Sequence, residues 1–110
     1  MAKTRTYSRY STKAASLLGK QIKLGRKERK WTVQDLADRA GISRATLQKI
    51  EKGDLTCALG LVFEVAVLVG VKLFDSESSS LATYLERTDD KLALFPKSIH
   101  KSKKVVDDDF

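Results

Sequence analysis

The chain has 110 residues, of which 42% are hydrophobic and 32% are charged, a balance that is typical of one small globular domain and excludes an intrinsically disordered chain. One cysteine, Cys57, and one histidine, His100, exclude an internal disulfide and a cysteine-based metal cage, so we expect no metal site and no cofactor. The formal net charge of +7 indicates a polyanionic partner.

The positive charge is concentrated in the first quarter of the chain. Residues 1–30 contain ten Lys or Arg residues against one acidic residue, Glu28, whereas residues 31–110 contain eleven against thirteen. This asymmetry predicts one basic arm or face that follows the phosphates of a nucleic acid. A solvated tail that only keeps the protein soluble is the alternative.

The N-terminal segment lacks both helical periodicity and the apolar stretch of a signal peptide, so we expect a cytoplasmic protein. Residues 1–12 are polar and basic, and we expect them to form an arm that is mobile when free. Apolar residues then recur at helical spacing at Ala14, Leu17, Leu18 and Ile22. This pattern predicts an amphipathic helix over 13–29 with a strongly basic outer face.

Two short helices are predicted by the stretch WTVQDLADRAGISRATLQKIEKG. Thr32 suits the N-cap of a helix over Val33–Ala40, where Asp35 completes a capping box and Gly41 ends the helix in the left-handed conformation. The same device then repeats, because Ser43 can cap a third helix over 44–52.

The spacing of these two helices is that of a helix-turn-helix unit. Its inward positions are Leu36, Ala40, Leu47 and Ile50, with the small Ala37 at the helix crossing. Its outward positions on the second helix are Arg44, Ala45, Gln48 and Lys49. A helix that reads DNA must expose hydrogen-bonding groups to base edges while its other face packs on the preceding helix. A helical hairpin of an ordinary bundle is the alternative.

Residues 58–69 are apolar nearly all round, with Glu64 as the only charge. A helix of that kind must be covered on more than one side, and it is too short to span a membrane. We expect the core to contain Leu59, Val62, Val65, Ala66 and Val69. Phe63 and Val67 are expected to contact a partner subunit, which predicts a homodimer; full burial within the monomer is the alternative.

The C-terminal part contains one more predicted helix. A short extended piece is expected over 71–74, and Asp75 or Ser76 can cap a last helix that ends before Pro96. Its apolar stripe is formed by Leu81, Tyr84, Leu85 and Thr88. The chain therefore divides into a basic arm (1–12), a helix-turn-helix domain (13–74, with the unit itself at 33–52), a C-terminal helix (75–96) and a disordered tail (97–110), for which a docking segment is the alternative.

The stretch from Ile22 to Gly70 resembles the Cro/phage-repressor helix-turn-helix family, also called the XRE type. The resemblance rests on Arg26, on the string WTVQDLADRAGISRATLQKIEKGD and on the helix ending VAVLVGV. It implies an all-α, five-helix repressor-like domain that binds double-stranded DNA at a palindromic operator as a homodimer.

The resemblance also implies roles for individual residues. Arg44, Ala45 and Lys49 fall where the family contacts bases, beside the outward-facing Gln48. Ser43 and Thr46 fall where the family often contacts phosphate. Arg26 and Glu51 match a pair that packs between the first and third helices as a structural ion pair.

Two positions depart from the family pattern. Val33 stands where a Gln commonly anchors the second helix to a phosphate, and Lys30 stands where a helix-ending Gly is common. We therefore expect Lys30, Gln34 and the arm residues Arg5 and Arg9 to rebuild the phosphate contacts.

The C-terminal part supports a narrower resemblance. The stretches GDLTCALGLVFEVAVLVGVKLFD and LALFPKSIHKSKKVVDDDF are similar to HipB-like antitoxins, regulators encoded beside HipA-type kinases. That similarity implies autorepression of a toxin-antitoxin operon and binding of a HipA-like serine/threonine kinase. A stand-alone XRE-type regulator and a protein-interaction module without a DNA site are the alternatives. We expect no enzyme, because the sequence offers no nucleophile–base pair and no Gly-rich phosphate loop.

Overall fold

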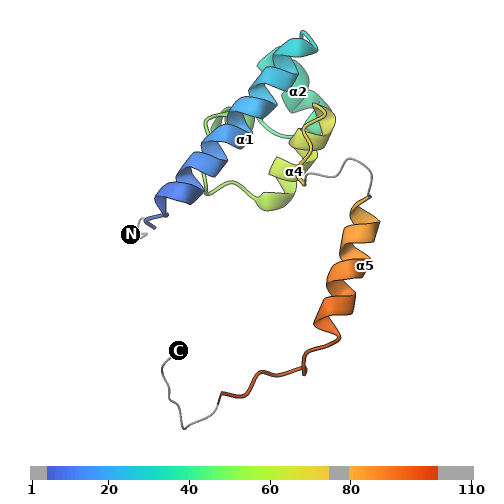
Figure 1. Ribbon diagram of the computed structural model, residues 1–110. Coiled ribbons are helices and arrows are strands. Elements are labelled where there is room, and N and C mark those ends of the chain that lie inside the picture. The colour runs from blue at the N-terminus through green and yellow to red at the C-terminus, as the bar shows by residue number, and fades with distance from the viewer. Residues whose placement is uncertain (1–4, 75–79, 102–110) are drawn as a thin grey trace. The chain divides into compact units, whose positions relative to one another are not determined.

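The computed structural model describes residues 5–74 and 80–101. These residues form five α-helices and no strand: α1 (Arg9–Glu28), α2 (Val33–Ala40), α3 (Arg44–Glu51), α4 (Leu59–Leu68) and α5 (Leu81–Leu92) (Figure 1). The chain divides into two compact units, Met1–Asp75 and Ser76–Phe110. The all-α, five-helix class expected from the sequence is confirmed.

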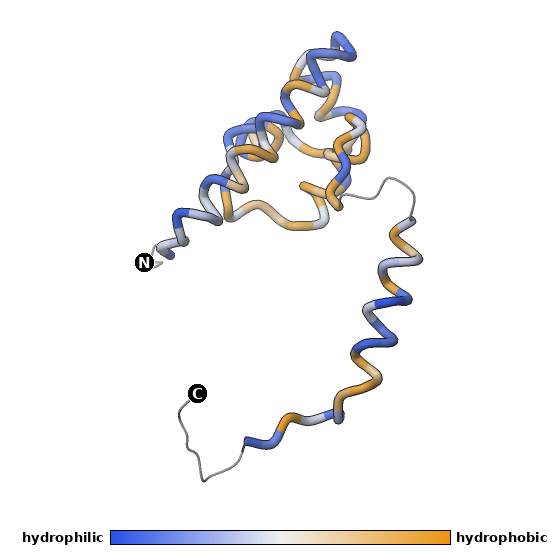
Figure 2. Tube along the Cα trace, in the orientation of Figure 1, coloured by the Kyte–Doolittle hydropathy of each residue, from blue (hydrophilic) through white to orange (hydrophobic). Residues whose placement is uncertain are grey.

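The core of the first unit lies among α1, α2, α3 and α4. α1 packs on α3, and α2 packs on both α3 and α4. The buried apolar side chains are Ile22, Leu36, Ala37, Leu47, Ile50, Val65, Ala66 and Val69. Hydrophobic and hydrophilic residues alternate every few positions along α1, as an amphipathic helix requires (Figure 2).

α1 and the end of α3 approach so closely that only a glycine fits between them. A Cβ atom on Gly19 would lie 2.6 Å from the carbonyl oxygens of both Ile50 and Glu51. Because those atoms belong to the backbone, they cannot move aside as a flexible side chain could. Gly19 therefore sets how α1 crosses the third helix.

The first helix starts earlier than the sequence suggested. α1 begins at Arg9 and not at Lys13, and its N-cap is Ser8, whose Oγ accepts a hydrogen bond from the Ser11 N–H at 3.1 Å. The expectation of a non-helical arm is therefore wrong for residues 9–12. The apolar pattern does not predict this first turn, because its one large apolar side chain, that of Tyr10, is exposed.

α2 and the start of α3 follow the sequence prediction. The Asp35 N–H donates to Thr32 Oγ1 at 3.0 Å and the Thr32 N–H donates to the Asp35 carboxylate at 2.9 Å, which completes the predicted capping box. Gly41 has φ of 70°, in the left-handed region, and turns the chain into α3. α3 ends at Glu51, one residue before the predicted end.

α4 divides between core and surface nearly as expected. Val65, Ala66 and Val69 are buried, and Val62 packs against them. The assignment of Leu59 to the core is wrong, because 66% of this residue is exposed at the first position of α4. After α4 the chain is irregular over 71–74, with neither helix nor strand.

The second unit contains α5. Its N-cap is Ser80, whose Oγ accepts a hydrogen bond from the Thr83 N–H at 3.3 Å, so the cap expected at Asp75 or Ser76 is wrong. Those two residues lie outside the described part of the chain. α5 ends at Leu92, before Pro96, and contains no buried residue.

Candidate nucleic-acid interface

α3 separates a polar outer face from an apolar inner face. Leu47 and Ile50 are buried on its inner side. The side chains of Arg44, Ala45, Gln48 and Lys49 are all exposed, as expected for residues that contact bases. α3 therefore has the two faces that a DNA-reading helix requires.

The N-terminus of α3 is capped within the chain. Ser43 Oγ accepts the Thr46 N–H at 3.0 Å and donates to Thr46 Oγ1 at 2.8 Å. Ser43 is exposed and Thr46 is half-buried. The remaining N–H groups of the first turn, together with the helix dipole, favour an anion at this end.

Gln34, a candidate phosphate ligand, already has a partner in the structure. Its Nε2 donates to Asp38 Oδ1 at 2.8 Å on the exposed side of α2. A phosphate contact by Gln34 therefore requires exchange of this hydrogen bond. The Asp38 carboxylate also places a negative charge beside the expected contact.

Lys30 takes over the conformation of the glycine that it replaces in the family pattern. Its φ is 62°, the only positive φ outside glycine among the described residues. The chain leaves α1 here, because the Lys30 N–H donates to the Lys27 carbonyl at 2.9 Å and the Trp31 N–H to that of Arg26 at 3.1 Å. The Lys30 side chain is exposed, so a phosphate could reach it.

The two arm residues occupy different environments. The Arg5 guanidinium lies 5.6 Å from the centre of the Tyr7 ring, before α1 begins. Arg9 is the first residue of α1 and is exposed. Within residues 5–74, no hydrogen bond or ion pair joins either arginine to α3.

Arg26 and Glu51 fasten α1 to the end of α3. Arg26 Nε donates to one Glu51 oxygen at 2.8 Å and Nη2 donates to the other at 3.1 Å. Arg26 Nη1 also donates to the Trp31 carbonyl at 2.9 Å. One guanidinium thus joins α1, the segment between α1 and α2, and the end of α3.

Sequence reasoning missed the stacking around Trp31. The Arg39 guanidinium lies 4.2 Å from the centre of the indole ring, and that of Arg29 lies 5.8 Å away. Each distance is within cation–π range, about 6 Å. The spacing of residues in the sequence does not predict that both guanidinium groups lie near the Trp31 ring, because Arg29 and Arg39 belong to different helical segments.

Cys57 offers no activated nucleophile. Burial raises the pKa of its half-buried thiol, and the nearby Asp54 carboxylate raises it further. The thiol therefore stays protonated at neutral pH, whereas a nucleophilic cysteine requires a lowered pKa. Within residues 5–74 and 80–101, no His, Cys, Asp and Glu side chains cluster to hold a metal ion, and no helix could span a bilayer.

A capped helix, a left-handed glycine turn and a second helix with an exposed polar face define a helix-turn-helix protein.

Comparisons with known proteins lead to the same class of protein. The Helix-turn-helix family model matches residues 22–74. An uncharacterized HTH-type transcriptional regulator of Methanocaldococcus jannaschii is 46% identical over 44 residues, which are 40% of this chain and 67% of that protein. The chain belongs to the XRE-type helix-turn-helix family of DNA-binding transcriptional regulators.

Solved structures match the same architecture. A chain of a HipB–O2 20mer complex has a TM-score of 0.50 and 22% identity, covering 71% of this chain and all (100%) of that chain. A chain of a HipA–HipB–O2–O3 complex has the same TM-score of 0.50 and identity of 22%, covering 70% of this chain and 100% of that one. At this identity the likeness shows the fold alone.

Proposed function

We propose that the protein is a sequence-specific transcriptional repressor that binds a palindromic operator as a homodimer, with α3 in the major groove. The outer face of α3 is the observation that supports this proposal best. The side chains of Arg44, Gln48 and Lys49 make no hydrogen bond or ion pair within the described residues, so their donors can reach DNA, although the Asp54 carboxylate lies near Lys49. Arg and Lys pair with the O6 and N7 atoms of guanine, and Gln pairs with adenine.

Binding to selected DNA tests this function directly. The full chain would select duplexes from a random library, and the affinities for the selected palindrome, its half-site and random DNA would be compared at one salt concentration. We expect the palindrome to bind about a thousandfold more tightly than random DNA, at the lower end for specific regulators. If the affinities for all three duplexes are equal, the protein does not recognise a DNA sequence, and the proposal is wrong.

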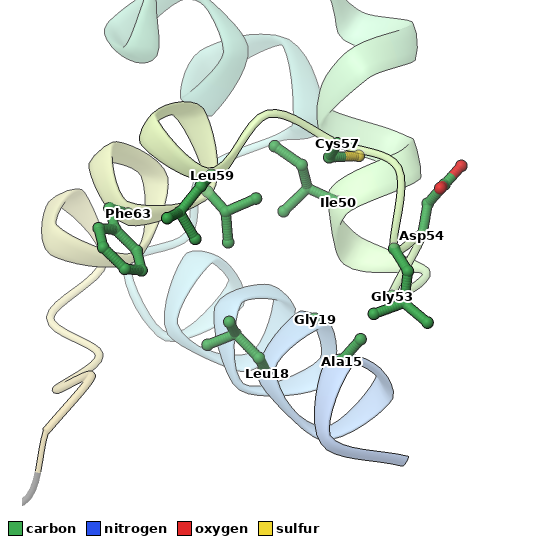
Figure 3. Close-up of a pocket in the computed structure, with 11 residues that line it drawn as sticks. Ala15, Leu18, Gly19, Ile50, Gly53, Asp54, Cys57, Leu59 and Phe63 are labelled. Carbon is green, nitrogen blue, oxygen red and sulfur yellow. The ribbon is translucent and has the colours of Figure 1, made fainter. Parts of the chain in front are cut away.

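The proposed dimer contact is the exposed side of α4. Phe63 is 36% exposed and Val67 is 66% exposed, although both are apolar. Phe63 and Leu59 border an apolar groove of about 170 Å³ between α4, α1 and the segment after α3 (Figure 3). A second copy packed on this face would remove apolar surface from water. To bind a palindrome, such a dimer must place its two α3 helices about 34–36 Å apart, one turn of DNA.

Phe63→Asp tests the dimer contact. The charge should produce a folded monomer whose operator affinity collapses, because each half-site is then held alone. Leu61→Asp is the matched control, since Leu61 is also 36% exposed but lies on another side of α4. Sedimentation measures mass and circular dichroism measures folding. If Phe63→Asp unfolds the protein, Val67→Asp applies the same test at a more exposed position. A parent protein that is monomeric at micromolar concentration contradicts the proposal.

We further propose an antitoxin setting, in which the protein represses its own operon and binds a HipA-like kinase in the cytoplasm. The resemblance of the stretches after Glu51 to HipB-like regulators supports this setting, whereas the structural likeness bears on the fold alone. Co-purification with a kinase encoded by the adjacent gene tests it. If no such kinase is encoded there or none binds, the protein is a stand-alone regulator.

A further inference from the structure

The outer side of α1 carries a row of apolar residues that nothing in the described first unit covers. Tyr10, Leu17 and Leu24 recur every seven positions and are 82%, 58% and 58% exposed. At 1.5 Å per residue, the row extends over about 21 Å. It lies on the side of α1 away from Ile22 and Arg26, which are buried.

A row of lysines runs beside the apolar row. Lys13, Lys20 and Lys27 each follow one of its members by three positions and are exposed. The described residues contain one ion pair, between Arg26 and Glu51, so none of these lysines is neutralised by a carboxylate.

Repulsion between basic residues destabilises parts of α1, although the helix dipole favours Arg26 and Lys27 in its last turn. Arg9 lies at the positive end of the helix dipole, and α1 has no acidic residue in its first turn. Like charges also face each other at i and i+4 in the pairs Arg9–Lys13 and Lys23–Lys27. An anionic partner would relieve this repulsion.

A hollow lies at one end of the apolar row. It has a volume of about 360 Å³ and is bordered by Gln21, Leu24 and Glu28 of α1 and by the chain after α4, residues 69–72. An apolar side chain from a segment lying along the row could enter it at Leu24, whereas the Glu28 carboxylate disfavours an acidic side chain there. The outer side of α1 therefore combines an apolar row, a cationic row and a concave end.

Other polyanions fit this surface less well. α1 packs on α3 through its opposite side, at Gly19, so DNA bound to α3 does not lie on the row. A DNA backbone would gain nothing from three exposed apolar residues. A helix that lies in a membrane surface needs a wide apolar face, whereas this row is one residue wide.

The apolar row and the lysine row together form one surface, called the α1 row: Tyr10, Leu17 and Leu24 with Lys13, Lys20 and Lys27. We propose that the α1 row binds an acidic amphipathic helix of a partner protein. Apolar residues of the partner helix, repeated every seven positions, would lie on the apolar members, and its carboxylates would pair with the lysines. The inference goes beyond the proposed repressor function, because the α1 row is separate from α3.

Peptide titration tests the proposal on the full chain. The probe is a synthetic amphipathic helix of about three heptads with Leu at the contact positions and Glu beside them. Its first control has the same composition in an order that destroys the apolar stripe, and its second control carries Lys in place of Glu. We expect amide NMR shifts along the α1 row and at the hollow with the acidic helix, and at least tenfold weaker binding of both controls. Shifts located on α3, or equal binding of the reordered peptide, would overturn the proposal.

Reversing the charge of the three lysines tests whether they bind the carboxylates of the peptide. The triple variant Lys13→Glu, Lys20→Glu and Lys27→Glu should lose the acidic peptide and gain the basic one. The matched control, Lys91→Glu, Lys97→Glu and Lys101→Glu in the second unit, makes the same change in net charge and should keep the acidic peptide. Circular dichroism confirms that both variants fold. If the first variant still binds the acidic peptide, the proposal is wrong.

Two further readouts separate the α1 row from the DNA and dimer surfaces. Leu17→Ser should weaken peptide binding at least tenfold and leave both operator affinity and sedimentation unchanged. Loss of operator affinity would assign the surface to DNA, and conversion of a dimer to a monomer would assign it to a second copy. Either result overturns the assignment to a partner helix, whatever the outcome for the repressor function.

Discussion

Arg26 and Glu51 meet in a bidentate ion pair, with donor–acceptor distances of 2.8 and 3.1 Å, that joins α1 to the end of α3. Their side chains are only 8% and 7% exposed. A buried charge without its partner retains its desolvation cost. The pair therefore links the stability of the domain to the placement of α3.

Glu51→Ala should destabilise the protein by about 3–5 kcal/mol, because it leaves the Arg26 guanidinium buried with only the Trp31 carbonyl as an acceptor. Urea unfolding measures the change. The double variant Arg26→Met, Glu51→Leu is the control and should cost less than the single variant, since no charge remains. A Glu51→Ala protein that unfolds at the same urea concentration as the parent would refute a structural role for the pair.

Gly19→Ala should be destabilising by about 1–3 kcal/mol or more, because its Cβ would meet the carbonyl oxygens of Ile50 and Glu51. Gly60→Ala is the contrasting variant, since no atom lies within 4 Å of the added Cβ and alanine favours the helix by roughly 0.5–1 kcal/mol. Thermal unfolding of both proteins tests the pair of predictions. Equal effects would show that α1 and α3 do not pack as closely as described.

Lys30→Gly should stabilise the protein by roughly 0.5–1 kcal/mol, because glycine adopts the φ of 62° without the cost that lysine has in the left-handed region. Lys30→Ala is the control, since it removes the same charge and keeps a Cβ atom. If Lys30 contacts a phosphate, both variants should also reduce the slope of log affinity against log salt by about 0.9. Equal stability of the two variants would argue against backbone strain at this position.

Protonation of Asp35 should lower the free energy of unfolding of the domain as the pH becomes acidic. The hydrogen bond from the Thr32 N–H, and then the one with the Thr32 hydroxyl, lower the pKa of the Asp35 carboxyl from its ordinary value of 3.8. Because the pKa is lower in the folded state, the stabilisation is present above pH 3.8 and is lost as the pH falls through the folded-state value. Asp35→Asn should therefore flatten the loss of stability below about pH 4. Urea unfolding at a series of pH values measures it, and an unchanged profile would contradict the capping role.

Local signals made the helix-turn-helix unit predictable. The bounds of α2 follow from Thr32, Asp35 and Gly41, which are neighbours in sequence and act within one helix. The first residue of α3 follows in the same way from Ser43. Caps and turns of this kind depend on short-range hydrogen bonds, so the sequence alone reveals them.

Features that depend on long-range packing were less predictable. The first turn of α1 buries no apolar side chain, and the exposure of Leu59 depends on where α4 meets the core. The stack of Arg39 on Trp31 joins α2 to the segment after α1 and arises from side-chain conformations that no periodicity encodes. The sequence indicates which residues face outward, whereas their partners follow from the structure.

The most direct test of the central claim, that α3 reads DNA bases, is the ratio of operator affinity to random-DNA affinity in Arg44→Ala. An arginine bonded to guanine O6 and N7 contributes roughly 1–3 kcal/mol of discrimination, so the ratio should fall by about five- to 150-fold. Arg39→Ala removes an exposed arginine from α2 and should leave the ratio unchanged. If Arg44→Ala instead weakens binding to operator and random DNA equally, Arg44 contacts only phosphate, and the proposed role of α3 in base recognition is contradicted at its main residue.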